Sequence, residues 1–311
     1  MRFLCTNRNT GCRPARAVGR RPSCKVDMAF AYKYCNAHGL DILTSLHLKI
    51  TPPNQFNDPF EFTPHVVCSN PARRIKRFFN DKTNLTKLYI AKKKAGFPGS
   101  FREFRKQLRQ EIPTIIDSLA PHVPKISRET QPGYLDHISK TYGVLCMSRR
   151  RDSLLMWGHY CDRYRGLVIG FDDQHQPFRG VNGLHPVKYV RQRVLFDSAW
   201  KQGSVGERTF ENQIVFSKNE EWSYEEELRQ LFLLSRLNQK QLDGGQIGYF
   251  LPIQAEAIVS VTVGPRCSNG LYAATQRALK VPHFRHVEFN RAELHETEFK
   301  LNFIQQASSR R

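Results

Sequence analysis

The chain has 311 residues, which is long enough to bury a substantial hydrophobic core in one large domain or two small ones. No stretch approaches the roughly 18 consecutive apolar residues of a membrane-spanning helix, so we expect no membrane partner. The eight cysteines are scattered and show no C-x-x-C spacing, which disfavours a structural zinc site and a disulfide framework. These features predict a reduced, cytoplasmic protein. Its formal net charge of +20 is distributed unevenly along the chain.

The N-terminal segment, residues 1–27, is strongly basic. It holds seven Lys or Arg against one acidic residue, Asp27, and it lacks the apolar run of a secretory signal. Two interpretations are open: a disordered basic tail, or a segment upstream of a true start at Met28. We favour the second, because the first patterned segment follows directly.

The next segments predict a strand at 29–34, a short amphipathic helix at 39–46 and a strand at 47–51 that Pro52 and Pro53 end. A turn motif, Phe-Asn-Asp-Pro-Phe-Glu, follows at 56–61. Asn57 and Asp58 favour a turn, and proline after Asp58 excludes helical geometry there. The carboxylates of Asp58 and Glu61 would then lie on a stiff loop that the flanking Phe56 and Phe60 anchor to the core. The alternative is that Asp58 caps a turn and that Glu61 pairs with an Arg or Lys.

A basic block with helical spacing of apolar residues follows from about 73 to 120, with expected interruptions near 96–99 and at Pro113. Residues 71–110 hold 13 Lys or Arg against two acidic residues, a net charge of +11. Such a segment attracts phosphate, so it predicts a nucleotide or nucleic-acid partner, although a solvated helix face gives the same pattern. We interpret 71–140 as a helical insertion or lid.

Beyond the insertion, we expect buried strands at 143–148 and 166–171, separated by a helix at 152–164 that Asp152 or Ser153 caps. On this helix, Trp157 and Tyr160 are three residues apart and share one face, while His159 points elsewhere. The aromatic pair could be core or a ring-stacking platform. His159 titrates near neutrality, so it could be a general acid or base, or a structural histidine.

Further strands are expected at 185–190, 228–234, 247–253, 258–263 and 285–289, with a helix at 271–279. Side-chain alternation places Glu225, Glu227 and Arg229 on one face of the segment that leads into the strand at 228–234. Two carboxylates beside an arginine can separate acid and base roles, and Lys218 could add a positive group for phosphate. A solvated edge strand with a local ion pair is the alternative.

These elements predict an α+β fold, in which a mixed, largely antiparallel sheet forms the core and the basic helices are inserted. Helices do not regularly separate the strands, which argues against a doubly wound sheet. We therefore expect residues 28–311 to form a single α+β domain.

Several motifs in register resemble the bacterial domain of unknown function 2971 family. They are the stretches at 32–34, 56–61, 143–148, 152–160 and 166–172, Lys218 with 222–229, and 263–266. The similarity covers about residues 32–299, and it implies no established activity.

A weaker, fold-level analogy is to ADP-ribosyltransferases. There a polar residue of the first strand holds the NAD ribose, an aromatic ring stacks on nicotinamide, and a late-strand Glu stabilises the oxocarbenium-like ribose. The analogy implies Lys33 for the first position, where the chain departs from the NAD-clamping pattern. Tyr34 or Trp157 would supply the ring, and Glu225 or Glu227 would be the late glutamate.

Three functional hypotheses follow. The first is an enzyme acting on a nucleotide or NAD-like substrate. Its catalytic candidates are Asp58, Glu61, His159, Glu225 and Glu227, and its substrate-binding candidates are Lys33, Tyr34, Asn57, Trp157, Tyr160, Lys218 and Arg229. The second is a nucleic-acid-binding protein or a metal-dependent nuclease, in which the same carboxylates hold Mg²⁺ and the basic block 71–110 tracks phosphates. The third is a non-catalytic binding module, in which Asn57, Asp58, Trp157 and Glu225 lock loops together.

Overall fold

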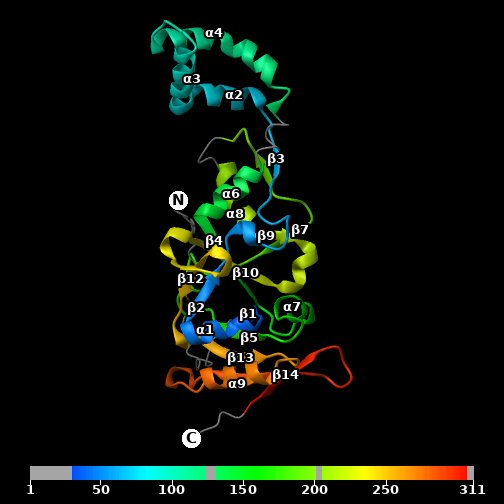
Figure 1. Ribbon diagram of the computed structural model, residues 1–311. Coiled ribbons are helices and arrows are strands. Elements are labelled where there is room, and N and C mark those ends of the chain that lie inside the picture. Colours follow the sequence, from blue (N-terminus) through cyan, green and yellow to red (C-terminus); the bar gives the residue numbers. More distant parts are fainter. Residues whose placement is uncertain (1–29, 124–130, 201–204, 307–311) are drawn as a thin grey trace, which may run out of the picture.

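The computed structural model describes residues 30–123, 131–200 and 205–306 of the chain, so the expectation about residues 1–27 lies outside it. The described part has the predicted α+β fold, built on a mixed sheet of eight strands (Figure 1). In spatial order the strands are β15 (Leu301–Gln305), β14 (Glu288–Leu294), β13 (Ile258–Val263), β5 (Leu167–Asp172), β1 (Phe30–Cys35), β4 (Tyr142–Ser148), β10 (Glu227–Leu233) and β6 (His185–Pro186). All neighbours in this sheet are antiparallel except β13 and β14.

The described residues also form three smaller sheets. β11 (Asn238–Gln241), β12 (Ile247–Pro252) and β2 (His47–Ile50) form an antiparallel sheet. Two parallel pairs join β3 (His65–Val67) to β8 (Leu195–Asp197) and β7 (Lys188–Val190) to β9 (Ser217–Asn219). The second pair places Tyr189 of β7 opposite Lys218 of β9.

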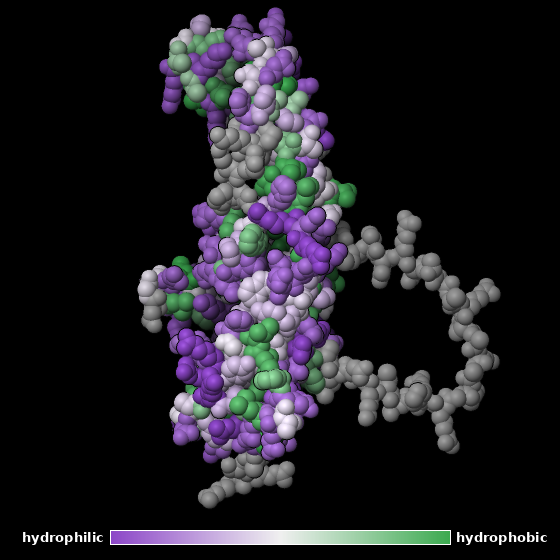
Figure 2. Space-filling view, turned by 90° about the vertical axis from the view of Figure 1, so that its right-hand side faces the viewer, coloured by the Kyte–Doolittle hydropathy of each residue, from purple (hydrophilic) through white to green (hydrophobic). Residues whose placement is uncertain are grey.

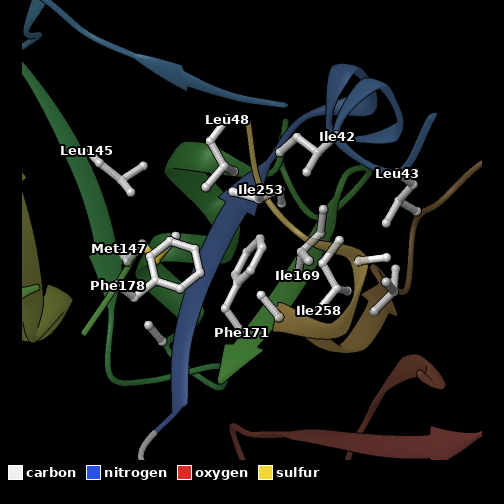
Figure 3. Packing of buried hydrophobic residues seen from close by; sticks show 14 of the residues in the cluster. Ile42, Leu43, Leu48, Leu145, Met147, Ile169, Phe171, Phe178, Ile253 and Ile258 are labelled. Carbon is white, nitrogen blue, oxygen red and sulfur yellow. The ribbon is translucent and has the colours of Figure 1, made fainter. Parts of the chain in front are cut away.

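The main hydrophobic core lies on one face of the large sheet. Figure 3 shows Leu145 and Met147 of β4 and Ile169 and Phe171 of β5 packing toward Leu48 of β2. The helices α1 (Leu40–Ser45) and α9 (Asn269–Ala278) lie against the same body (Figure 1). Apolar residues at alternate and at consecutive positions of these strands explain why the sequence predicts most of them.

The basic block forms three helices, α2 (Pro71–Asn80), α3 (Lys82–Lys94) and α4 (Phe101–Leu119), which we name the helical arm. Figure 1 shows the arm at the end of the molecule opposite α9. Its helices pack on each other around Leu85, Phe104 and Leu108, a cluster separate from the main core. The arm is held to the body in part by Arg77, which donates hydrogen bonds to the carbonyl oxygens of Ser198 and Trp200.

The remaining α-helices of the described ranges are α6 (Gln131–Thr141), α7 (Leu154–Tyr160) and α8 (Val205–Val215). Short 3-10 helices are η1 (Ala37–Gly39), η2 (Pro53–Gln55), η3 (Glu220–Glu225), η4 (Leu234–Arg236), η5 (Asp243–Gly245), η6 (Ala255–Ala257) and η7 (Pro282–Phe284). None of the helices in the described ranges is long and apolar enough to cross a membrane.

Several predicted boundaries were wrong. Helix α4 continues through Pro113, where we expected an interruption. The helix expected at 152–164 ends at Tyr160, because three successive residues from Asp162 to Tyr164 have positive φ. The strand expected at 185–190 is divided between two sheets, and the strand expected at 285–289 begins instead at Glu288.

Candidate functional site

The turn motif carries Glu61 into the body of the protein. Asp58 accepts a hydrogen bond from the Phe60 backbone N–H at 2.9 Å, and the Glu61 N–H donates to the Asp58 carbonyl oxygen at 3.1 Å. The turn forms as Asn57, Asp58 and the following proline predict. Phe60 does not anchor it, because its side chain is 60% exposed. The anchor is Phe62, which is buried and contacts the Phe56 ring edge-on at a centroid distance of 5.0 Å.

Three further charged residues reach the same point from the start of β10. Glu227 and Arg229 share one face of the strand, as alternation predicts. Glu225 lies in η3 rather than in the strand, and Glu226 between them takes a left-handed conformation with φ 42°. With this left-handed residue between them, the side chains of Glu225 and Glu227 both reach Lys218, while the side chain of Glu226 is half exposed.

Lys218 of β9 binds three carboxylates at once. Its Nζ lies 2.6 Å from Glu225 Oε2, 3.2 Å from Glu227 Oε2 and 3.2 Å from Glu61 Oε1. The last contact has ion-pair distance but not hydrogen-bond geometry, so Glu61 Oε1 has no donor in the described part of the chain. The Trp222 ring also faces the ammonium group at 4.9 Å.

Arg229 completes the group, which we name the buried ionic cluster: Glu61, Lys218, Glu225, Glu227 and Arg229. The guanidinium is fully buried, and it donates to Glu227 through Nε at 2.8 Å and through Nη2 at 3.0 Å. Nη2 also contacts Glu61, and Nη1 donates to the Val215 carbonyl oxygen at 2.9 Å. The aromatic pair Phe56 and Phe62 flanks it at 5.6 and 5.3 Å.

Tyr160 links the cluster to α7. Its hydroxyl donates to Glu225 Oε1 at 2.6 Å, and Asn57 also hydrogen-bonds to Tyr160. Burial and the neighbouring Glu225 raise the pKa of Tyr160, so its hydroxyl keeps its proton and acts as a donor. Two of the predicted substrate contacts, Asn57 and Tyr160, therefore support the cluster.

Two glutamates of the cluster have pKa values that are shifted in opposite directions. Burial alone would raise the pKa of Glu227, but Arg229 and Lys218 outweigh it and lower that pKa to about 2. At Glu61 burial prevails over the same two cations, and Glu227 adds repulsion, so the pKa of Glu61 is raised. Lys218 has a raised pKa, because the three glutamates overcome its burial. The cluster thus contains firmly charged groups and one carboxyl, Glu61, that resists ionisation.

The acidic residues converge, as the enzyme hypothesis predicts, but they surround two cations rather than an open substrate. All five side chains of the cluster are at most 5% exposed. Within the described ranges no three His, Cys, Asp or Glu side chains are arranged to hold a metal ion, so the proposed Mg²⁺ ligands find no support there. The contacts make the cluster an ionic lock that joins the 56–62 turn, β9 and β10.

Other candidates lie elsewhere. Trp157 is fully buried, donates from Nε1 to the Arg151 carbonyl oxygen and packs edge-on against Tyr34, so neither ring has a face free for a ligand. Both rings belong to one buried hydrophobic cluster, which is the core alternative of the two that the sequence left open. Lys33 donates to the Cys146 carbonyl oxygen at 2.8 Å, a contact that ties β1 to β4. His159 is exposed and lines a separate shallow hollow with Asn36, Ala37, His38, Tyr160 and Asp162.

The sequence did not single out three residues that support the lock. Phe62 follows the motif directly and flanks Arg229, Trp222 covers Lys218, and the Tyr189 hydroxyl accepts the Glu227 N–H at 2.8 Å. Phe62 and Trp222 could have been found from the sequence, because each is an aromatic residue close to an acidic segment. Tyr189 had no such signal, since its role depends on the pairing of β7 with β9.

A cavity of about 220 Å³ adjoins the cluster on the side of Glu61 and Lys218. Its other lining residues are Asp58, Phe60, Phe62, Thr63, Val190, Arg191, Gln192, Arg193, Val194, Ile214, Ser217 and Asn219. This volume is below the roughly 300–1,000 Å³ of pockets for drug-sized ligands, so it suits a small group and not a whole dinucleotide.

In comparisons with known proteins, no family model, no curated protein and no solved structure matches this chain.

Proposed function

We propose that the protein binds nucleic acid through the helical arm. The observation that carries the proposal is a stripe of four exposed cations on α4: Arg102, Arg105, Lys106 and Arg109. Their spacing of i, i+3, i+4 and i+7 places them on one side of the helix, and Phe104 and Leu108 face the arm's own core on the other side.

The charge of this stripe is not neutralised by neighbours. No carboxylate in the described part of the chain lies within ion-pairing distance of its four cations. The nearest acidic residue, Glu103, is engaged in the capping box with Ser100. Seven residues of α-helix span about 10 Å, so the stripe can contact successive phosphates of one strand.

The rest of the arm strengthens the same attraction. Exposed lysines and arginines of α2 and α3 add to the field, among them Lys76, Lys82, Lys87 and Lys94. Figure 2 shows hydrophilic residues over much of this end of the molecule, around smaller apolar patches. A cationic surface of this kind binds a polyphosphate backbone mainly by releasing its counterions, so binding weakens steeply with salt.

The test is fluorescence anisotropy with a labelled 20-base-pair DNA duplex and a single-stranded RNA of equal length, from 50 to 300 mM salt. The variant replaces all four stripe residues with glutamine (R102Q, R105Q, K106Q and R109Q). Each lost phosphate contact lowers the slope of log affinity against log salt by about 0.9 for duplex DNA, so we expect the slope to fall by about 3 to 4.

A control variant matches the charge change at a distance from the arm: K240Q, R277Q, K280Q and R285Q, all at exposed positions. We expect it to keep most of the wild-type slope. Equal losses in the two variants would show only a non-specific effect of net charge, and the proposal would be wrong. The enzyme hypothesis stays a prediction. Its candidate catalytic carboxylates in the buried ionic cluster form ion pairs with Lys218 and Arg229, which were the candidate substrate-binding cations.

A further inference from the structure

The strand β15 is an edge of the large sheet, and no strand in the described part of the chain pairs with its outer side. On its inner side the Gln306 N–H donates to the Phe289 carbonyl oxygen at 2.8 Å, and the His295 N–H donates to the Lys300 carbonyl oxygen at 3.1 Å. Hydrogen-bonding direction alternates along an antiparallel ladder, so the even-numbered residues of β15 direct their backbone groups toward β14. The odd-numbered residues direct theirs outward: Leu301, Phe303 and Gln305.

This edge lacks the features that usually protect an edge strand. Proteins blunt such edges with charge, proline, bulges or very short strands. The opposite edge of the same sheet, β6, has two residues and contains Pro186, and the edge strand β11 of the smaller sheet carries Lys240. The sequence of β15, Leu-Asn-Phe-Ile-Gln, has neither charge nor proline, and its pairing with β14 has no register shift. The edge is therefore open to a further strand.

The outer edge of β15 is complementary to itself. When two copies run antiparallel about a two-fold axis at Phe303, Phe303 lies opposite its own copy and Leu301 lies opposite Gln305. All of these positions direct their backbone groups outward, so the free N–H and C=O groups of both strands form hydrogen-bonded pairs. At the neighbouring position Ile304, which is 44% exposed, lies opposite Asn302 of the second copy. The pairing thus also covers an exposed apolar side chain.

Charge favours the same antiparallel pairing. The hairpin tip between β14 and β15 exposes Glu296 and Glu298. Glu298 pairs with Lys300 at 2.6 Å, whereas Glu296 makes no ion pair within the described ranges. Beyond β15 the sequence holds Arg310 and Arg311. Antiparallel pairing brings the C-terminal end of β15 in one copy to the acidic hairpin tip of the other, so opposite charges meet at both ends of the contact.

We propose that two copies of this chain dimerise through β15, in an antiparallel pairing that joins their large sheets into one. The contact is isologous, so it closes on itself and adds no third copy. In Figure 1 the hairpin, drawn in red, and the helical arm lie at opposite ends of the molecule. The two arms therefore lie at the far ends of the dimer. The contact is independent of the proposed binding of nucleic acid.

The test is sedimentation velocity of the full chain, free of nucleic acid, from about 1 to 100 µM. We expect the mass to rise with concentration to twice the 36.1 kDa of one chain. Ile304→Lys brings a charge from each copy into the contact, and Gln305→Pro removes an outward N–H. Each should weaken dimerisation at least about tenfold. The control Ile247→Lys makes the same change at an exposed position of β12 and should dimerise as the wild type does.

A pair of charge-reversed variants tests the orientation. E296R with E298R makes the hairpin tip basic, and R310E with R311E makes the segment beyond β15 acidic. Each double variant should dimerise weakly alone, and an equal mixture of the two should recover dimers, because opposite charges then meet at both ends. No recovery in the mixture would contradict the antiparallel pairing.

Thermal melts verify that every variant is folded. A wild-type chain that stays monomeric throughout this range would overturn the proposal, and so would an assembly larger than a dimer. Dimerisation unchanged in both Ile304→Lys and Gln305→Pro would overturn it as well, because the contact would then lie on another surface. None of these results would affect the test of the arm.

Discussion

Glu227 and Glu61 lie in the same buried ionic cluster, yet their pKa values move in opposite directions. Glu227 has two hydrogen bonds from Arg229 and a contact with Lys218, which together outweigh its burial. Glu61 contacts the same cations with one oxygen lacking a donor, so burial prevails. Two deeply buried carboxylates therefore differ in pKa according to how many donors each of them receives.

This difference predicts how stability depends on pH. The pKa of Glu227 is about 2 in the folded chain against an ordinary value of 4.5. Its contribution is complete above about pH 4.5 and is lost as the pH falls toward 2, an effect on the order of 3 kcal/mol in the free energy of unfolding. Urea unfolding between pH 2.5 and 6 should therefore show a steep loss of stability in wild type and a flatter profile in Glu227→Gln.

The neighbouring Glu226→Gln is the control, because the Glu226 side chain is half exposed and lies outside the cluster. It should follow the wild-type profile. Glu61 has the opposite effect, at higher pH. Its raised pKa means that ionisation is disfavoured in the folded state, so the protein should lose stability as the pH rises above 4.5. A Glu227→Gln profile as steep as wild type below pH 4.5 would contradict the assignment.

For individual residues, the sequence predicted which side chains share a face of a strand better than it predicted which residues they contact. Alternation placed Glu227 and Arg229 together correctly, because both belong to one strand. It could not show that Glu61, 168 residues earlier, would bind Arg229, since that contact depends on tertiary packing. It also could not decide whether Trp157 would be core or a ligand platform, because both uses give the same helical spacing.

Among the elements, α4 departs most from local sequence rules. Pro113 lies inside this helix, where it has no N–H for the carbonyl oxygen of Arg109. The helix persists because the capping box at Ser100 satisfies its N-terminus and because Phe104 and Leu108 bury its apolar side. Tertiary packing thus prevails over the proline, which explains the wrong expectation of a break.

Replacing this proline should stabilise the arm. Pro113→Ala restores the N–H and removes the ring, and proline is about 3 kcal/mol less favourable than alanine inside a helix. We expect a higher urea midpoint for loss of the helical circular dichroism signal. Ser100→Ala removes the N-terminal cap, which costs about 1 kcal/mol of stability, and it should therefore lower the same urea midpoint. A lower midpoint for Pro113→Ala would indicate that the proline itself is needed for packing.

The strands of the large sheet were predictable where they are long and buried, as at β4, β5 and β13. Each contains a run of apolar residues, which is typical of a strand covered on both faces. The pairs β3 with β8 and β7 with β9 were not predicted, because three-residue strands carry almost no periodic signal. Lys218 lies in β9, a strand of the second pair. The position of Lys218 in the buried ionic cluster was therefore not predictable from local sequence pattern.

On the scale of the whole molecule, the chain contains separate hydrophobic clusters. The main core packs β1, β4, β5 and β13, while the helical arm packs around Leu85, Phe104 and Leu108. In Figure 1 the arm extends away from the sheet at one end. Units with separate cores open independently when few contacts join them. We therefore expect the arm to lose structure while the ionic lock and the sheet remain folded.

Leu108→Ala tests this independence. The buried leucine supports the arm's cluster, and its truncation should destabilise the arm by about 2–5 kcal/mol. Hydrogen exchange followed by mass spectrometry should show faster exchange in peptides from α2–α4 and unchanged exchange in β4 and β5. Leu119→Ala, at an exposed position of the same helix, should leave both regions unchanged. Faster exchange throughout β4 and β5 in Leu108→Ala would mean that arm and sheet unfold as one unit, and binding defects of arm variants would then need correction for global stability.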